Sequence, residues 1–297
     1  MKRTVFVAAL LGATVLGAPA SYANSWWNAD WWDNFMNSCT TLCDDDRVDI
    51  RQQLYGLQEA INNIVDIDDA TDIVQTAVNA GNLVDLDVDS IVLGTVDQKA
   101  NVGQYAHNLV DGDMFSTFKN LEQAATNVVN SVTGSTAYNI KQSVTNSQVA
   151  LNDMFGGKGG YDVDLEGELE DAMTQTAVNA ANLIDIGTLK NEISQYSGNA
   201  QTAINTAAFE GFSYYWYNHA PDVWDLGQSA TNVTNNVSVG EIDLRAACAC
   251  GYEIDQYANA DQLAKNVLST MGDVNNIIQQ ATNVANSVSL PAAPAAP

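Results

Sequence analysis

The sequence predicts an all-β fold in which repeats stack as the coils of a β-solenoid-like structure. The first observation is the unit QTAVNAGNLVDL at residues 75–86, which returns one hundred positions later as QTAVNAANLIDI. The second is that inward and outward residue types alternate within the unit, which indicates strands. The third is composition, because asparagine, a poor residue for helix interiors, occupies 31 of the 297 positions.

The first residues have the pattern of a secretory signal. Lys2 and Arg3 precede an apolar run, residues 4–17, that is too short to span a bilayer. Pro19 and the Ser-Tyr-Ala sequence at 21–23 then predict cleavage before Asn24. We therefore expect residues 1–23 to be removed on export, which leaves a mature chain without a transmembrane span.

The mature chain is strongly acidic. Without Lys2 and Arg3 it holds nine basic residues against 36 acidic ones, a net charge of −27. Nucleic acids and anionic membrane surfaces need Lys and Arg to neutralise their phosphates, so the charge argues against both as partners.

Residues 24–47 differ in character from the rest of the chain. They contain four tryptophans, at Trp26, Trp27, Trp31 and Trp32. This segment is expected either to contact carbohydrate, lipid or another subunit, or to cap the first repeat, because repeat arrays need a capped end.

The four cysteines fall in two close pairs, Cys39 with Cys43 and Cys248 with Cys250. Disulfides are expected in an exported protein, although the sequence leaves their pairing open. The spacings and the scarcity of histidine argue against a thiolate metal site.

The repeats occupy residues 48–290, followed by a Pro/Ala tail at 291–297. Weaker partial copies start at Gln58, Gln104, Gln142, Gln201 and Gln262, so that successive starts lie 17 to 34 residues apart. The average interval of roughly 25 residues is typical of stacked repeat units. Two inserts, near 153–170 and 210–226, interrupt the series.

The alternation within the unit changes phase in its middle. Asn82, Val84 and Leu86 share one face, whereas Gln75, Ala77 and Asn79 fall on the opposite sequence parity. A bend at Ala80-Gly81 would bring both halves inward. The alternative is an all-α protein of amphipathic repeats, since apolar residues at 125, 128, 129 and 132 also fit helical spacing.

Stacking explains why inward positions would keep amide side chains. Each amide both donates and accepts, so identical residues in coils about 4.8 Å apart can form continuous hydrogen-bond ladders. The predicted ladder residues are Gln75, Asn79, Asn82, Gln123, Asn127, Asn130, Gln175, Asn179, Asn182, Gln228, Asn232, Asn235, Gln279, Asn283 and Asn286.

Regularly placed Gln and Asn with Ala or Gly between them, as at Gln75, Asn79 and Asn82 and their copies, resemble the repeats of secreted bacterial functional amyloids. The curli and Fap fibre subunits belong to this class. The resemblance implies β-strand stacking, a location at the bacterial cell surface or in the extracellular matrix, and self-association or binding to other surface and matrix proteins.

The acidic residues raise the question of a metal. Asp85, Asp87 and Asp89 place hard oxygen ligands on one strand face, which suits weak, shared Ca²⁺ binding. Solubilising charge that blocks edge-to-edge strand pairing is the preferred interpretation, so no cofactor is expected. The sequence holds no recognisable catalytic motif, and we expect no enzyme activity.

The sequence therefore favours an exported structural protein for adhesion, surface anchoring, or fibre and biofilm-matrix assembly. Two alternatives remain. One is a monomeric surface module that binds a polysaccharide or Ca²⁺, and the other is a secreted glycan hydrolase on a β-helix scaffold.

Overall fold

The computed structural model describes residues 47–86, 92–156, 173–209, 212–214, 217–219, 223–242, 253–270 and 272–290. The chain divides into two units, Met1–Arg47 and Val48–Pro297, and the structure below is that of the second. The tryptophan segment, the four cysteines, Asp87 and Asp89 lie outside the described residues. In the part that is described, no helix is long and apolar enough to cross a membrane.

The described chain is all-β, as predicted, and the all-α alternative is wrong. Four long strands are β1 (Arg47–Leu86), β2 (Val92–Gly156), β3 (Met173–Phe209) and β7 (Leu226–Ile242). Shorter strands complete the stack: β8 (Glu253–Ala258), β9 (Asp261–Thr270), β11 (Ile278–Val284) and β12 (Ser287–Ser289). Two small pairs lie outside it: antiparallel β4 (Phe212–Tyr214) with β5 (Tyr217–His219), and parallel β6 (Val223–Trp224) with β10 (Val274–Asn275).

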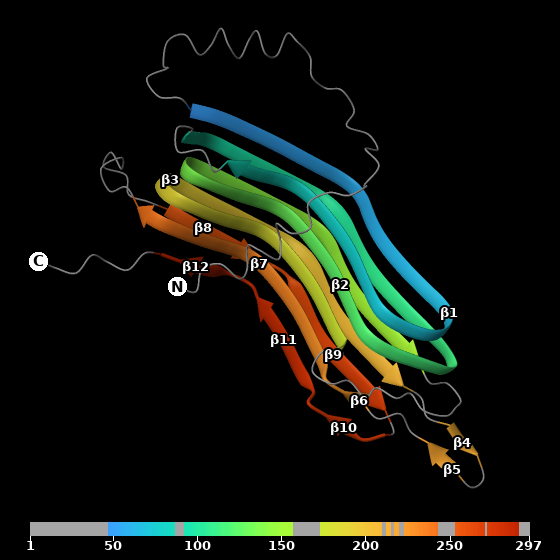
Figure 1. Cartoon of the computed structure of the whole chain (residues 1–297). Coiled ribbons are helices and arrows are strands. Elements are labelled where there is room, and N and C mark those ends of the chain that lie inside the picture. The colour runs from blue at the N-terminus through green and yellow to red at the C-terminus, as the bar shows by residue number, and fades with distance from the viewer. Residues whose placement is uncertain are drawn as a thin grey trace, which may run out of the picture. The chain divides into compact units, whose positions relative to one another are not determined.

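The main sheet is a parallel stack (Figure 1) in the order β1-β2-β3-β7-β11, with β8 and β9 on β3 and β12 on β7. Its repeating element is a coil, defined here from its first to its last inward amide. Coils 1 to 5 comprise residues 52–82, 98–130, 142–182, 195–235 and 256–286. Hydrogen-bonded partners in neighbouring coils are 44 to 61 residues apart. Each coil therefore contains two sequence units, and the interval of roughly 25 residues described half a coil.

The two halves of a coil differ in their spacing of amides. In coil 3 the first half, here the outbound arc, places Gln142, Gln148 and Asn152 inward. The second half, the return arc, places Gln175, Asn179 and Asn182 inward. Side-chain amides of each arc reach backbone carbonyls of the other, as when Asn182 donates to Tyr196 O at 2.8 Å. The arcs therefore form two layers with the amides between them.

The predicted bend of the return arc lies at the second asparagine. Asn82, Asn130, Asn182 and Asn235 have φ angles of 51°, 55°, 52° and 54°, in the left-handed region that asparagine tolerates better than most residues. In β3 the alternation of buried residues shifts at this point: Gln175, Ala177 and Asn179 are buried, and beyond Asn182 the buried residues are Ile184 and Ile186. The phase change read from the sequence is confirmed, with the bend two residues after Ala80.

Small side chains let the two layers approach each other. A column of buried alanines from both arcs runs through the stack: Ala77, Ala106, Ala125, Ala150, Ala177, Ala203 and Ala230. Larger apolar side chains fill the two ends of each coil. Val132, Ile184 and Val237 belong to one of these clusters, and Phe118, Met154 and Phe209 to the other. Burial of these side chains stabilises the stack by roughly 1.5–3 kcal/mol each.

Candidate functional site: the amide ladders and the ends of the stack

Six amide ladders run through the five coils, with side-chain hydrogen bonds of 2.5–2.9 Å. The return arcs form the three predicted ones: Gln75-Gln123-Gln175-Gln228-Gln279, Asn79-Asn127-Asn179-Asn232-Asn283 and Asn82-Asn130-Asn182-Asn235-Asn286. The outbound arcs form three more: Gln52-Gln98-Gln142-Gln195-Gln256, Gln58-Gln104-Gln148-Gln201-Gln262 and Asn62-Asn108-Asn152-Asn205-Asn266.

Sequence reasoning predicted none of the three outbound ladders. It grouped Gln142 with Gln58 and Gln104, whereas Gln142 accepts from Gln195 at 2.8 Å and donates to Gln98 at 2.8 Å. The residue equivalent to Gln58 in coil 3 is Gln148. The signal that would have found these ladders is the spacing Gln-x5-Gln-x3-Asn, which the outbound arcs of all five coils share.

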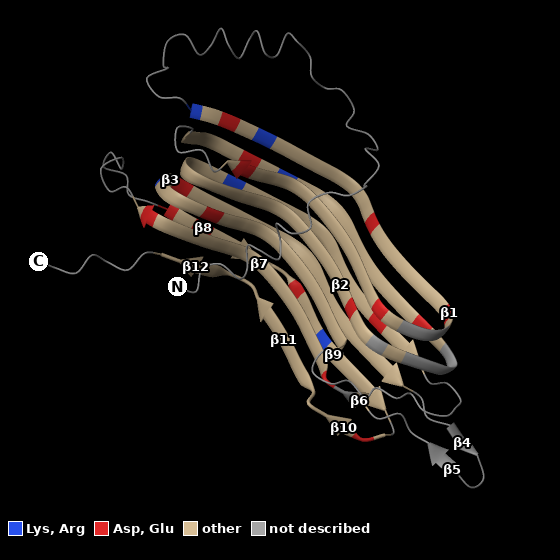
Figure 2. Cartoon of the chain, viewed as in Figure 1, with Lys and Arg blue, Asp and Glu red and all other residues tan. Residues whose placement is uncertain are grey.

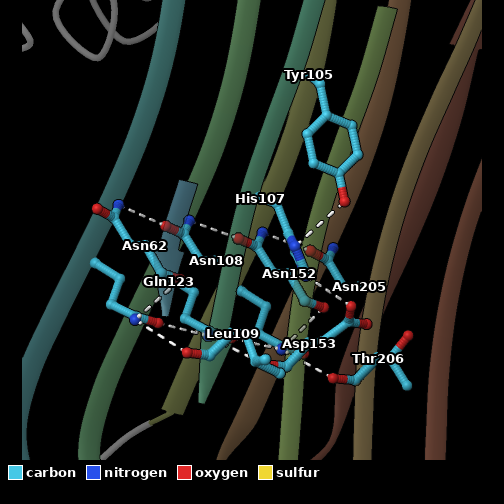
Figure 3. A network of polar contacts seen from close by, with 12 residues as sticks. Asn62, Tyr105, His107, Asn108, Leu109, Gln123, Asn152, Asp153, Asn205 and Thr206 are labelled. Carbon is cyan, nitrogen blue, oxygen red and sulfur yellow. Dashed lines mark hydrogen bonds and ion pairs between the residues drawn. The ribbon is translucent and has the colours of Figure 1, made fainter. Parts of the chain in front are cut away.

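Inside the stack the ladder amides are buried, and most of them use all their hydrogen-bonding groups. Asn179 donates to Asn232 Oδ1 at 2.9 Å and to Thr202 O at 2.7 Å, and it accepts from Asn127 at 2.8 Å. Its side chain is 0% exposed. A buried amide without partners costs about 1–3 kcal/mol, so the ladders satisfy groups that would otherwise oppose folding. Part of this network is shown in Figure 3, where Asn62, Asn108, Asn152 and Asn205 form one row.

The ladders have a direction. Every asparagine ladder donates from a coil to the next coil along the chain, as in Asn62 to Asn108. Every glutamine ladder donates backward, as in Gln104 to Gln58. Most of these amides donate their second hydrogen to a backbone carbonyl, as Asn127 does to Val149 O and Gln104 does to Val128 O. Because a carbonyl can only accept, this second bond fixes the orientation of the amide. The two ends of the stack therefore differ chemically.

Coil 1 and coil 5 end the ladders with groups that receive no partner among the described residues. In coil 1 the side-chain oxygens of Asn62, Asn79 and Asn82 accept no hydrogen bond, since each donates forward. In coil 5 the side-chain oxygens of Gln256, Gln262 and Gln279 accept none, since each donates backward. The backbone edges of these coils also lack a strand partner within the described sheet.

Exposed large apolar side chains are concentrated at the same two ends. On coil 1 and its strand β1 they are Val48, Tyr55, Leu57, Ile61, Val65, Val74 and Leu83. On coil 5 and the residues beside it they are Tyr257, Leu263, Val274, Ile278, Val288 and Leu290. Of the described residues in this class, Tyr196 alone lies elsewhere, and its ring stacks on Tyr257 at 5.4 Å. Large apolar side chains are therefore exposed at both ends of the described stack.

One titratable cluster lies on the outward side of the outbound arcs (Figure 3). His107 Nε2 is 2.9 Å from an oxygen of Asp153 in the next coil, and Tyr105 Oη is 3.2 Å from His107 Nδ1. Burial raises the pKa of the Tyr105 hydroxyl above its ordinary value, and the carboxylates of Asp153 and Glu59 raise it further. The phenol is thereby held in its protonated form, in which it can donate to the imidazole.

We expect Tyr105 to make the fold sensitive to alkali. Unfolded tyrosine ionises near pH 10, whereas the folded state holds this proton more tightly, so the free energy of unfolding falls as the pH rises from about 10 through the raised folded pKa. Tyr105→Phe should reduce that fall, as measured by urea unfolding between about pH 9 and 11. Tyr55→Phe, at a residue that is 66% exposed, is the control and should leave the slope unchanged. If the free energy of unfolding fell equally steeply with pH in both variants, the alkaline sensitivity would not come from Tyr105.

The predicted calcium ligands are not assembled into a site by the described residues. Asp85 is exposed on β1, and Asp87 and Asp89 lie outside the described residues. Within the described part of the chain, no group of three or more His, Cys, Asp or Glu side chains is placed to hold a metal ion. Weak calcium binding at Asp85, Asp87 and Asp89 therefore stays a prediction from the sequence.

The fold and the ladders define the chain as a β-solenoid-like stack of parallel coils. Comparison with protein-family models, with curated proteins and with solved structures finds no match.

Proposed function

We propose that the protein is an exported structural protein that assembles into fibres or a surface matrix through its stacked Gln and Asn repeats. The observation that carries the proposal is that six hydrogen-bond ladders run through five coils and end at coil 1 and coil 5 with acceptors that no described residue uses. A ladder of this kind can be continued by any strand that presents the same amides in the same register.

The two edges support self-association more than they support a monomer. Proteins usually protect an open sheet edge with charges, prolines, bulges or a covering element, because an unpaired edge recruits further strands. Here the described edge strands carry exposed Val74 on one end and Ile278 on the other, at 66% and 67% exposure. Clustered apolar groups of this kind mark interaction surfaces.

Two features of the sequence support the proposed location and role at the surface. The N-terminal signal pattern at residues 1–23 supports export, and the acidic composition supports a soluble surface that repels like copies until counter-ions screen it. Adhesion or anchoring is then a property of the assembled material. No enzymatic step is part of the proposal.

The test is the assembly of the purified chain as a function of concentration and salt. We expect fibres by negative-stain microscopy, a thioflavin signal, and a diffraction spacing of about 4.8 Å along the fibre. Growth should be faster at high salt, because the Debye length falls from about 30 Å at 0.01 M to about 3 Å at 1 M. The repulsion between mature chains of net charge −27 is then screened.

A chain that stays monomeric by sedimentation at high concentration and at both salt levels would overturn the proposal. Replacement of a half-buried, outward-facing residue outside the ladders, on a central strand, supplies the matched control. Val178→Ser alters the outward face of coil 3, and growth of its fibres should match that of the unmodified chain.

A further inference from the structure

We infer that the assembly partner is a second copy of the chain, joined head to tail, with coil 5 of one copy stacked in register on coil 1 of the next. This inference rests on the proposed function and adds the polarity and the register of the joint. It is carried by four features of the two ends: their common register, their complementary amides, their apolar residues, and one pair of opposite charges.

The register is set by columns of equivalent residues that already run through the stack. One outward column consists of Thr76, Ala124, Thr176, Ser229 and Gln280, as the pairings of β3, β7 and β11 and the adjacent Gln123–Gln75 bond establish. Each ladder residue of coil 5 has its counterpart in coil 1, at the same spacing within both arcs. A copy placed beyond coil 5 would therefore continue every ladder as a sixth coil.

The amides at the two ends are complementary in this arrangement. Among the described residues, the side-chain oxygens of Gln256 and Gln262 in coil 5 accept no hydrogen bond. In coil 1, Gln52 and Gln58 each donate one amide hydrogen to a carbonyl of β1, and the other hydrogen has no acceptor among the described residues. The asparagine ladders would be continued by hydrogen bonds donated in the opposite direction, from coil 5 to coil 1 of the next copy. Asn286, which accepts from Asn235, faces the position where Asn82 of the next copy has a free oxygen. The Gln bonds would thus run backward and the Asn bonds forward, as they do within the chain.

Apolar and charged groups agree with the same register. Val74 and Ile278 occupy one column, so the joint would cover both of these exposed side chains. A second column contains Arg51, Asp97, Lys141, Ser194 and Asp255, in which Arg51 lies 3.2 Å from Asp97. Asp255 at the end of this column would meet Arg51 of the next copy. Figure 2 shows basic and acidic residues side by side near the start of β1.

One column opposes the joint and explains why salt should promote it. Glu192 and Glu253 are neighbours in the stack, and Glu253 would approach Asp49 of the next copy. Like charges on adjacent strands are destabilising, and counter-ions reduce the effect.

Joining two like ends would lose these matches. Coil 1 of one copy could meet coil 1 of another only with their strands antiparallel. Because the spacing Gln-x5-Gln-x3-Asn is not symmetric, Gln of one copy would then lie opposite Asn of the other. A head-to-tail contact uses two different surfaces and does not close on itself, so it propagates as a fibre.

The test is disulfide trapping between two variants, Thr76→Cys and Gln280→Cys, both at exposed positions of the outward column. In the proposed register their Cα atoms lie at the strand spacing of about 4.8 Å, within the range of a disulfide. We expect mild oxidation of a mixture of the two variants to give a covalent dimer with a 76–280 linkage, identified by peptide mass mapping. Mapping also separates this product from any bond formed by the four native cysteines.

Three controls fix polarity and register. Each variant alone should give neither a 76–76 nor a 280–280 linkage, and the mixture of Val78→Cys with Gln280→Cys, which requires a slip of two residues, should give at least several-fold less product. Preferential 76–76, 280–280 or 78–280 linkage would overturn the inference. Fibres of the mixture without any 76–280 linkage would also overturn it, while leaving the proposed function in place; absence of fibres from the unmodified chain would overturn both.

Discussion

Replacement of Asn182 by alanine should destabilise the stack by about 4 kcal/mol or more, which is a large part of the 5–15 kcal/mol typical of a folded domain. Asn182 is 0% exposed, donates to Tyr196 O and to Asn235 Oδ1 at 2.8 Å each, and accepts from Asn130 at 2.9 Å. The variant leaves two buried side-chain amides and one partly buried carbonyl without this partner, at about 1–3 kcal/mol for each buried group. It also places alanine at a φ of 52°, which costs roughly a further 1–2 kcal/mol.

Two further variants separate these contributions in urea unfolding. Asn182→Gly keeps the left-handed backbone and removes the amide, so it should be less destabilising than alanine by about 1 kcal/mol. Asn286→Ala removes the last member of the same ladder, at an exposed position where water can replace the hydrogen bond that Asn286 accepts from Asn235. It should cost less than about 1 kcal/mol. Equal losses for Asn182→Ala and Asn286→Ala would contradict the ladder as a stabilising structure.

Replacement of Gly187 by alanine should also be strongly destabilising, although the residue lies at an exposed position. A Cβ atom there would be 2.5 Å from the carbonyl oxygen of Ser135 in the preceding coil, and 3.4 Å from its carbonyl carbon. Backbone atoms cannot move aside without separating the two coils. Overpacking of this kind typically costs about 1–3 kcal/mol, and more where strand pairing is lost.

Gly227→Ala is the matched control for this prediction. Its Cβ would meet nothing closer than Thr174 Cγ2, at 3.8 Å, so the substitution should be neutral or stabilise the fold by about 0.4–1 kcal/mol through the unfolded state. The midpoint temperature of thermal unfolding should thus fall for Gly187→Ala and should rise or stay unchanged for Gly227→Ala. A similar decrease for both would show that close contact between coils is not the cause.

Sequence reasoning could predict the return arc because all its signals lie within twelve residues. Gln75, Asn79 and Asn82 recur with the same spacing in five copies, and the alternation that flanks them indicates strands. The change of parity identified a bend, and asparagine at a positive φ is its physical cause. Local chemistry and stacking agree in this half of the coil, so the pattern was sufficient.

The outbound arc has only the spacing Gln-x5-Gln-x3-Asn as its signal, and the true length of the coil could not be obtained from the repeat unit. Gln52, Gln98, Gln142, Gln195 and Gln256 share few neighbouring residue types, and their equivalence depends on partners 44 to 61 residues away. Additional residues enter between Asn152 and Gln175 and between Asn205 and Gln228, at one bend of successive coils. Such insertions lengthen the interval between equivalent residues and leave the stack unchanged, because the free-energy cost of closing a loop rises only slowly with its length.

The chemical difference between the two ends was also beyond sequence reasoning. It arises from the opposite hydrogen-bond directions of Asn and Gln, as in Asn127 donating to Asn179 and Gln175 donating to Gln123. That direction depends on which carbonyl of the facing arc each amide reaches, for example Val149 O for Asn127. The sequence of one arc does not show which carbonyl of the facing arc each of its amides will reach.

The most direct test of the stacked coils is nuclear magnetic resonance of the chain with labelled alanine methyl groups. Ala125, Ala177 and Ala230 are paired in register and buried, so their methyl groups should give a series of cross-peaks between residues 52 and 53 positions apart. Ala150 and Ala203, paired in the outbound arcs, should give the corresponding peak there. Cross-peaks confined to residues three or four positions apart, with no Ala125–Ala177 or Ala177–Ala230 contact, would contradict the structure and the function proposed from it.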